Sequence, residues 1–188
     1  IGMLCLLICV KGAGFMGEIW DVYDIHRRRT GRQIIRGKEI KLGDYHIVIH
    51  VCFFNKKGEM LIQQRQSDRE SWANMWDVTV GGSALVGETS QQAAEREVEE
   101  EIGYTYDFSE IRPAMTINFN HGFDDYYVVE VELDSSELPI STEEVQQIEW
   151  ASKDEIIKRI REGTFISYHE SLIHLLFDMR NGDGARQG

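Results

Sequence analysis

GSALVGETSQQAAEREVEEEIGY, residues 82–104, is the most informative stretch of this 188-residue chain. A helix is predicted over residues 89–102. Thr89 and Gln92 have the spacing of a capping box, and Gly103 stands just past the helix end, a usual place for glycine. Residues four apart on one face form an apolar stripe, namely Ala94, Val98 and Ile102. The stretch therefore predicts an amphipathic helix that packs against a core.

The same helix gathers three carboxylates on one face. Glu100 and Glu101 follow Glu97 by three and four residues, so the three side chains project together. Like charges at these spacings repel by roughly a few tenths of a kcal/mol per pair, a cost that a hard cation would offset. Oxygen ligands favour Mg²⁺ or Mn²⁺ over zinc. The alternative interpretation is a charged surface helix stabilised by solvent.

The residues around these carboxylates form a longer motif with defined spacing. The motif resembles the Nudix signature at every fixed position, and a chance match is on the order of 10⁻⁸ per starting position. Tyr104 stands where an aliphatic residue is usual. The fixed residues are, in order, Gly82, Glu88, Arg96, Glu97, Glu100, Glu101 and Gly103.

The resemblance implies both a fold and an activity. The fold would be a Nudix-type α/β/α sandwich with a mixed β-sheet. The activity would be metal-dependent hydrolysis, in which water attacks the diphosphate linkage of a nucleoside diphosphate joined to another group, or of a related organic diphosphate. Glu97, Glu100 and Glu101 would hold Mg²⁺ or Mn²⁺, and Glu97 would also be a candidate base.

Further residues receive roles from the resemblance. Arg96 would pair with a carboxylate and hold it in place, and Glu88 would approach the helix and pair with Arg96 or the metal. Gly82 would let a backbone carbonyl come close to the metal. Members of the family often use another acid from a later loop. Glu143 and Glu144 are candidates, although a solvated loop acid is the more ordinary interpretation of either.

Two segments that extend the resemblance beyond the motif, residues 50–66 and 75–88, are similar to isopentenyl-diphosphate isomerase, which shares the Nudix fold but transfers a proton. Its relatives carry a catalytic cysteine, a small residue and a histidine, where this chain has Gly81, Gly82 and Ser83. Glycine has no side chain for acid–base chemistry. The hydrolase is therefore preferred. The isomerase remains an alternative, as does a non-catalytic nucleotide sensor, whose broken motif this chain lacks.

Substrate contacts are predicted from residue type. Arg65 and Arg69 are candidates for phosphate binding, because guanidinium binds phosphate in a bidentate manner; ordinary surface charge is the alternative. Trp76, like Trp72, could stack on a nucleobase, although a place in the core or at its rim is favoured.

Three residues on one face of a predicted strand could bind a transition metal. The favoured interpretation is that they have local partners within the fold. They are His46, His50 and Cys52.

Composition limits the classes of partner. The net charge of −12 argues against non-specific nucleic-acid binding, whereas a small diphosphate could bind through bridging cations. The cysteines, three in number, form no disulfide or zinc pattern, so a cytoplasmic protein with reduced thiols is expected. The first ten residues are apolar, but a membrane span needs about 20. No membrane partner is expected, and a homodimer stays an open alternative to a monomer.

Outside the glutamate-rich helix, short strands and two more helices are predicted. Polar turns are expected at residues 27–31 and 121–124, and helices at residues 153–161 and 170–180. Strands are expected at residues 20–23, 33–35, 45–54, 60–64, 77–80, 115–120, 126–133 and 148–151.

The apolar segment of residues 1–15 is predicted to be dispensable. It precedes Met16 and resembles nothing in the family, so the domain is expected to span residues 16–180, followed by a flexible tail at 181–188. A chain that begins at Met16 should fold and hydrolyse substrate like the full chain. A large drop in melting temperature, or lost activity, would show that the segment is structural.

Overall fold

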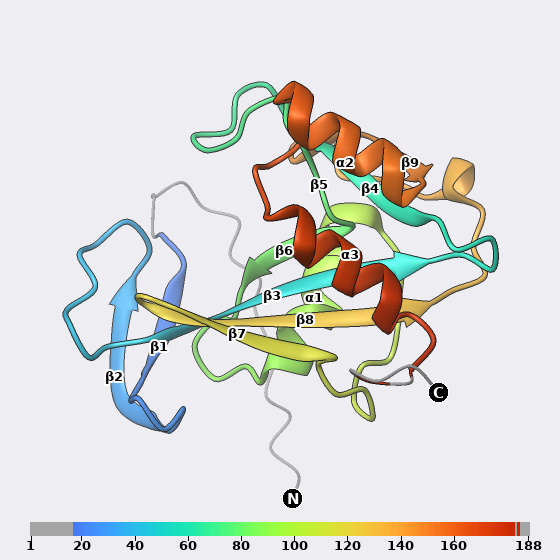
Figure 1. The fold of residues 1–188 in the computed structure, drawn as a ribbon. Coiled ribbons are helices and arrows are strands. Elements are labelled where there is room, and N and C mark those ends of the chain that lie inside the picture. Colours follow the sequence, from blue (N-terminus) through green and yellow to red (C-terminus); the bar gives the residue numbers. More distant parts are fainter. Residues whose placement is uncertain (1–16, 183, 185–188) are drawn as a thin grey trace, which may run out of the picture.

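Helices cover both faces of one sheet in the computed structural model, which describes residues 17–182 and residue 184 (Figure 1). Helix α1 (Ser90–Ile102) packs on one face, and helices α2 (Lys153–Glu162) and α3 (Glu170–Met179) pack on the other. The predicted α/β/α arrangement is confirmed. The expectation for residues 1–15 lies outside the described residues, as does most of the predicted tail.

Within the described residues, seven strands form a mixed sheet. The path through the sheet is β5–β4–β3–β8–β7, with β6 paired to β3 and β9 paired to β4. β3 and β8 are parallel, and the other pairs are antiparallel. The strands are β3 (His46–Phe54), β4 (Met60–Arg65), β5 (Trp76–Asp77), β6 (Val80–Ser83), β7 (Met115–Phe119), β8 (Gly122–Glu130) and β9 (Val145–Ala151).

Strand β3 contributes to the cores on both faces of the sheet, because successive side chains of a strand point in opposite directions. Val51 and Phe53 pack on the face that α1 covers, together with Val98. Cys52 and Phe54 pack on the face that α2 and α3 cover. All of these side chains are fully buried. This run therefore reads as continuously apolar rather than alternating, as expected for a central strand.

The ends of α1 follow the predicted capping. Thr89 Oγ1 accepts from the Gln92 backbone N–H at 3.2 Å, and the Thr89 N–H donates to Gln92 Oε1 at 2.9 Å. Gly103 has φ 64°, and its N–H donates to the Glu99 carbonyl. Both ends are fixed by local hydrogen bonds, so the carboxylates of α1 are presented from a helix with a defined start and stop.

The single strand predicted at residues 77–80 is wrong. The chain crosses there from β5, which pairs with β4, to β6, which pairs with β3. Thr79 lies at the crossing: its hydroxyl donates to the Leu61 carbonyl at 2.5 Å and accepts from the Phe53 N–H at 2.9 Å. Thr79 thus fills the gap between β3 and β4, which pair with each other only at Phe54 and Met60.

Both predicted turns are displaced. Residues 29–31 belong to strand β2 (Arg29–Ile35), and the turn lies at residues 24–28, where Asp24 Oδ1 accepts N–H groups from His26 and Arg28. Residues 122–124 belong to β8 because they pair in register with β3. A turn prediction uses only neighbouring residues, so it cannot detect this pairing between distant segments. The 3₁₀ helix Ser135–Glu137 was not predicted.

Strand β1 (Ile19–Tyr23) and β2 form a hairpin beside the main sheet. An ion pair anchors the hairpin: Arg27 donates to Asp125, which is fully buried, with Nη1 and Oδ1 2.9 Å apart. Arg29 also donates to the Glu88 carbonyl. These contacts hold the hairpin against β8 and against the loop that leads into α1.

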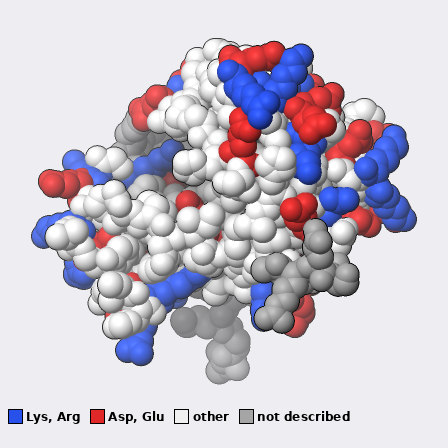
Figure 2. Space-filling model, viewed as in Figure 1, with Lys and Arg blue, Asp and Glu red and all other residues white. Residues whose placement is uncertain are grey.

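The described surface carries charges of both signs. In Figure 2 acidic and basic side chains alternate over α2 and along the edges of the molecule, while the middle of this face, where β7 and α3 lie, is largely uncharged. Within residues 17–182, no helix combines the length and the apolar character that crossing a bilayer demands.

Candidate functional site

A polar cleft lies beside the glutamate face of α1. Its inner part has a volume of about 110 Å³, and its outer part, of about 780 Å³, shares four lining residues with the inner part. The shared residues are Glu18, Arg36, Arg65 and Arg69. The inner part brings together most of the predicted site residues, namely Arg65, Arg69, Gly82, Arg96, Glu97, Glu100, Glu101 and Glu144.

Glu97 lies against strand β6 at Gly82. A Cβ at Gly82 would overlap the Glu97 carboxylate, so the close approach of helix and strand requires a glycine there. Burial raises the pKa of Glu97 to about 7, although the neighbouring Arg96 acts to lower it. A carboxylate with this pKa can exchange a proton near neutral pH.

Glu101 is the most deeply buried of the three helix carboxylates, with 4% of the residue exposed. Its Oε2 accepts a hydrogen bond of 2.6 Å from Gln63 Nε2 on β4. Burial raises the pKa of Glu101 well above its usual range, and the charge of Glu97 raises it further. Gln63 was not predicted as a site residue, although a polar residue inside the apolar strand MLIQQR was an available signal.

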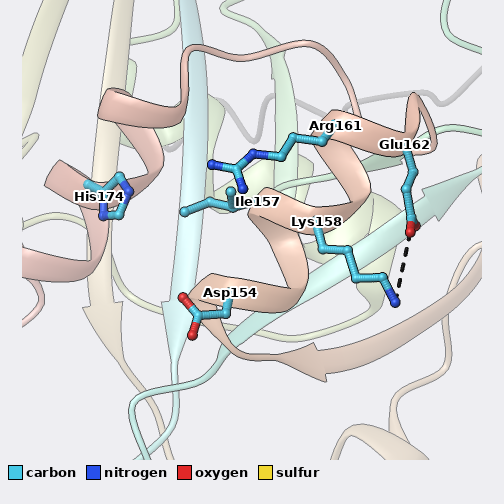
Figure 3. Close-up of a pocket in the computed structure, with 6 residues that line it drawn as sticks. All are labelled: Asp154, Ile157, Lys158, Arg161, Glu162 and His174. Carbon is cyan, nitrogen blue, oxygen red and sulfur yellow. Dashed lines mark ion pairs between the residues drawn. The ribbon is translucent and has the colours of Figure 1, made fainter.

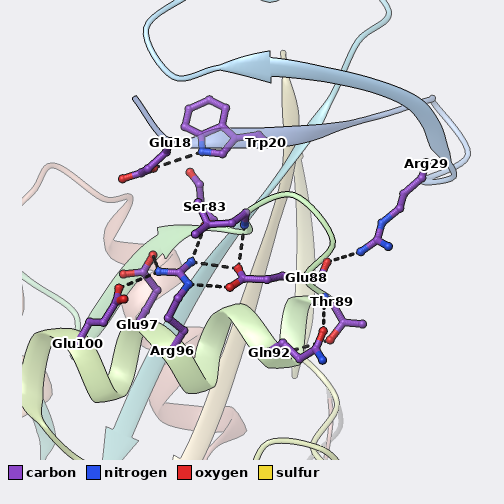
Figure 4. A network of polar contacts seen from close by, with 11 residues as sticks. Glu18, Trp20, Arg29, Ser83, Glu88, Thr89, Gln92, Arg96, Glu97 and Glu100 are labelled. Carbon is purple, nitrogen blue, oxygen red and sulfur yellow. Dashed lines mark hydrogen bonds and ion pairs between the residues drawn. The ribbon is translucent and has the colours of Figure 1, made fainter. Parts of the chain in front are cut away.

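Arg96 connects the carboxylates of the motif (Figure 4). Its Nε lies 2.7 Å from Glu88 Oε1, and its Nη1 lies 2.9 Å from both Glu97 Oε1 and Glu100 Oε2. Its Nη2 donates to the Ser83 carbonyl at 3.0 Å. One guanidinium therefore ties α1 to the loop before it and to the end of β6.

The donor chemistry of the cleft fits a hard divalent cation. The available ligands are carboxylate oxygens, which Mg²⁺ and Mn²⁺ prefer. Within residues 17–182, no three His, Cys, Asp or Glu side chains already converge as a metal site, because Arg96 lies between Glu97 and Glu100. Burial is the main cause of the raised pKa values of Glu97 and Glu101, and a bound cation would favour the charged form of both carboxylates.

Arginines also line the cleft. Arg69 pairs with Glu144 at 3.3 Å, and Arg36 pairs with Glu18 at 2.6 Å. Glu18 and Arg36 were missed in the sequence, since nothing local marks them and the packing of the hairpin brings them to the cleft. Of the two candidate loop acids, Glu144 lines the inner part, while Glu143 lines the outer part.

The expected substrate contact from Trp76 is corrected by the structure. Trp76 is only 8% exposed and packs in the core beneath α2 and α3, where the Arg159 guanidinium lies 4.5 Å from its ring. Neither Trp76 nor the exposed Trp72 lines the cleft. Trp76 is therefore a core residue, which was the favoured interpretation.

The histidines of β3 have local partners. His46 stacks on Trp20 with ring centroids 4.3 Å apart, and burial lowers its pKa to about 4. His50 stacks on Tyr126 at 4.5 Å. Cys52 is a buried free thiol in the core. Because His46 and His50 stack on neighbouring rings and Cys52 packs in the core, the favoured interpretation of local partners is confirmed.

Another hollow, of about 410 Å³, lies between α2 and α3 (Figure 3). Three of its charged side chains are paired: Lys158 lies 3.8 Å from Glu162, and Arg161 lies 2.7 Å from its neighbour Glu170. None of the predicted site residues lines it. The chemistry-bearing residues are instead concentrated in the cleft at α1.

Comparison with known proteins agrees with this geometry. The family model of the NUDIX domain matches residues 44–171, which include the cleft apart from the hairpin residues. This chain belongs to the Nudix family. A Nudix hydrolase of Listeria innocua is 43% identical over 164 residues, which are 87% of this chain and 96% of that protein. The expectation of a Nudix hydrolase is confirmed.

Two other relatives place this Nudix protein more broadly. A crystal structure from Deinococcus radiodurans has a TM-score of 0.68 and 22% identity, covering 90% of this chain and 100% of that one, and it supports the fold alone. An isopentenyl-diphosphate Delta-isomerase of Corynebacterium diphtheriae is 28% identical over 130 residues, covering 64% of this chain and 70% of that protein. This comparison supports the similarity to the isomerases that the sequence indicated.

Proposed function

We propose that this Nudix hydrolase is a pyrophosphohydrolase that needs Mg²⁺ or Mn²⁺. The substrate would be a nucleoside diphosphate linked to another group, or a related organic diphosphate. The observation that carries the proposal is one cleft lined both by the carboxylates of α1 and by arginines. Cations held by the carboxylates and the guanidinium groups together can balance the charge of a diphosphate.

In this proposal the carboxylates of Glu97, Glu100 and Glu101 hold the metal beside Gly82. Magnesium or manganese, when bound, supplies positive charge and lowers the pKa of the attacking water. Because Arg96 lies between Glu97 and Glu100, it has to shift toward Glu88 when the metal enters. Its bonds to Glu88 would keep it attached during that shift.

The protein side chains share the remaining work. Glu97 accepts the proton of the attacking water, and Glu144 is the second candidate for this role because it lines the inner part of the cleft. Arg65 and Arg69 bind the phosphates, and Arg36 adds a third positive charge to the cleft. Water attacks one phosphorus and expels a phosphate-bearing leaving group.

A panel of diphosphates tests this proposal. The full chain is incubated with magnesium and each of several nucleoside diphosphate derivatives and other organic diphosphates, and phosphate-containing products are identified. At least one member should be cleaved at its diphosphate linkage. Cleavage elsewhere, or none across a broad panel, would contradict the proposal.

Isopentenyl-diphosphate isomerase is the second candidate, favoured by the similarity to such isomerases. We expect no dimethylallyl diphosphate when labelled isopentenyl diphosphate is supplied, because Gly81 and Ser83 stand where the isomerase has its thiol and histidine. Cys52 cannot replace the thiol, since it is fully buried in the core. Product at an enzymatic rate would reverse the preference for the hydrolase.

The proposal also includes a cytoplasmic location. A buried, free Cys52 is compatible with a reducing compartment. Fractionation of the source cells with marker enzymes would test it, and recovery outside the cytoplasmic fraction would contradict it.

A further inference from the structure

Arg65 is held in the cleft by contacts with the loop that follows β4 and with Asp77 of β5. It stands where the inner and outer parts of the cleft meet, yet its side chain is only 16% exposed. Its Nε donates to the Ser71 carbonyl at 3.3 Å, and its Nη1 lies 3.9 Å from Asp77 Oδ2. Arg36, in contrast, has a side chain that is 52% exposed. The guanidinium of Arg65 is therefore held in place rather than free in solvent.

Asp77 is a buried carboxylate with an ordered set of partners. The residue is 5% exposed, and a buried charge is costly unless it is paired. Its Oδ1 accepts from the Val78 N–H and from the Tyr168 hydroxyl, each at 2.8 Å. Its Oδ2 faces Arg65. Among the described residues, Arg65 supplies the ion pair of Asp77.

The contacts from Tyr168 to Asp77 and from Asp77 to Arg65 connect the core with the cleft. Tyr168 precedes α3, Asp77 ends β5, and Arg65 ends β4. The Tyr168 hydroxyl fixes one oxygen of Asp77, so the other oxygen is aimed at the guanidinium. In the described residues, no hydrogen bond uses Nη2 of Arg65, which leaves that group available to a ligand in the cleft.

We propose that Asp77 is a positioning residue that holds Arg65 in the orientation needed to bind a diphosphate, and that Tyr168 holds Asp77. This inference rests on the proposed function in one respect, namely that the cleft binds a diphosphate. Asp77 acts through Arg65 and does not touch the substrate. Its effect is therefore on the affinity for the diphosphate group.

Asp77→Asn is the sharpest variant. The Val78 N–H and the Tyr168 hydroxyl both need an acceptor at Oδ1, so the amide oxygen stays there. The amide nitrogen then takes the place of Oδ2 and turns N–H donors toward the donors of Arg65. The fold keeps its hydrogen bonds, while the attraction for the guanidinium is lost.

The affinity for methylenediphosphonate, a non-hydrolysable diphosphate, is measured by calorimetry on the full chain with magnesium present. Arg65→Ala should weaken binding about tenfold, the size of a lost charge-assisted hydrogen bond. Asp77→Asn should weaken it by a similar factor, and the double variant no further, because both changes remove one interaction. Tyr168→Phe should act in the same direction with a smaller factor.

Glu170→Gln is the control, since Glu170 is also paired with an arginine, Arg161, and neither residue lines the cleft. It should leave the affinity unchanged even if it lowers the melting temperature.

Unchanged affinity in Arg65→Ala would overturn the inference. So would Asp77→Asn and Tyr168→Phe variants that lose stability but bind like the unaltered chain. Losses that multiply in the double variant, to about a hundredfold, would show that Asp77 acts independently of Arg65. The readout is binding, so a chain that shows this pattern but cleaves no diphosphate would contradict the proposed hydrolysis and leave the positioning role intact.

Discussion

Glu97→Gln is expected to lower kcat by a factor on the order of 10² to 10⁴, the usual range for loss of a general base. The amide keeps the shape of the side chain, but it has neither the charge that a cation needs nor the basicity that proton transfer needs. Glu101→Gln should also lower kcat strongly, because it removes the negative charge that lies deepest in the cleft. Steady-state rates on the best substrate of the panel provide the measurement.

The same charges predict a requirement for a divalent cation. Protein freed of metal with a chelator should be inactive, and added magnesium or manganese should restore turnover. Full turnover in thoroughly chelated protein would contradict the requirement for a divalent cation.

Glu99→Gln is the matched control for Glu97→Gln, since Glu99 lies on the same helix but is exposed and accepts a hydrogen bond from Thr105. It should retain nearly the full rate, and wild-type rates in Glu97→Gln would count against the assigned role.

Gly82→Ala is expected to lower activity by a factor on the order of 10², the cost of displacing a reacting group by about 1 Å. The added methyl would occupy the space of the Glu97 carboxylate, so Glu97 must move away from β6. The backbone of Gly82 is not in the left-handed region, so alanine should leave the fold largely intact. Rates and melting temperature are measured together.

Gly81→Ala is the matched control for this substitution. A Cβ at Gly81 would meet His50 Nδ1 at 3.4 Å, an ordinary contact on the other face of the strand. The loss of activity should be much smaller than for Gly82→Ala. Comparable rates in Gly82→Ala and the unaltered chain would show that the place of Glu97 against β6 does not matter for catalysis.

The part of the site that could be predicted from sequence is the part that local structure determines. Helix α1 carries its capping residues within its own sequence, so the relative placement of Glu97, Glu100 and Glu101 follows from helix geometry. The resemblance to the Nudix signature marked Gly82 as a site residue. Its close approach to the Glu97 carboxylate, however, is a tertiary contact that only the structure shows.

What could not be predicted depends on contacts between distant segments. Gln63 meets Glu101 through the packing of β4 beneath α1, and Trp76 enters the core because α2 and Arg159 cover it. The division of residues 76–83 into two strands depends on the separation of β3 from β4, which Thr79 fills. In each case the residue type was ordinary, and its neighbours gave it its role.

The β1–β2 hairpin completes the cleft from outside the part of the chain that matches the family model. It lies before residue 44, where the match to the family begins, yet residues at its two ends, Glu18 and Arg36, line the cleft. Several contacts fasten it: besides the pair of Arg27 and Asp125, Tyr23 and Tyr45 exchange two backbone hydrogen bonds, and the Val86 N–H donates to the Ile19 carbonyl. Substitutions at Glu18 or Arg36 can therefore change the outer opening of the cleft while the sequence of the glutamate helix stays the same.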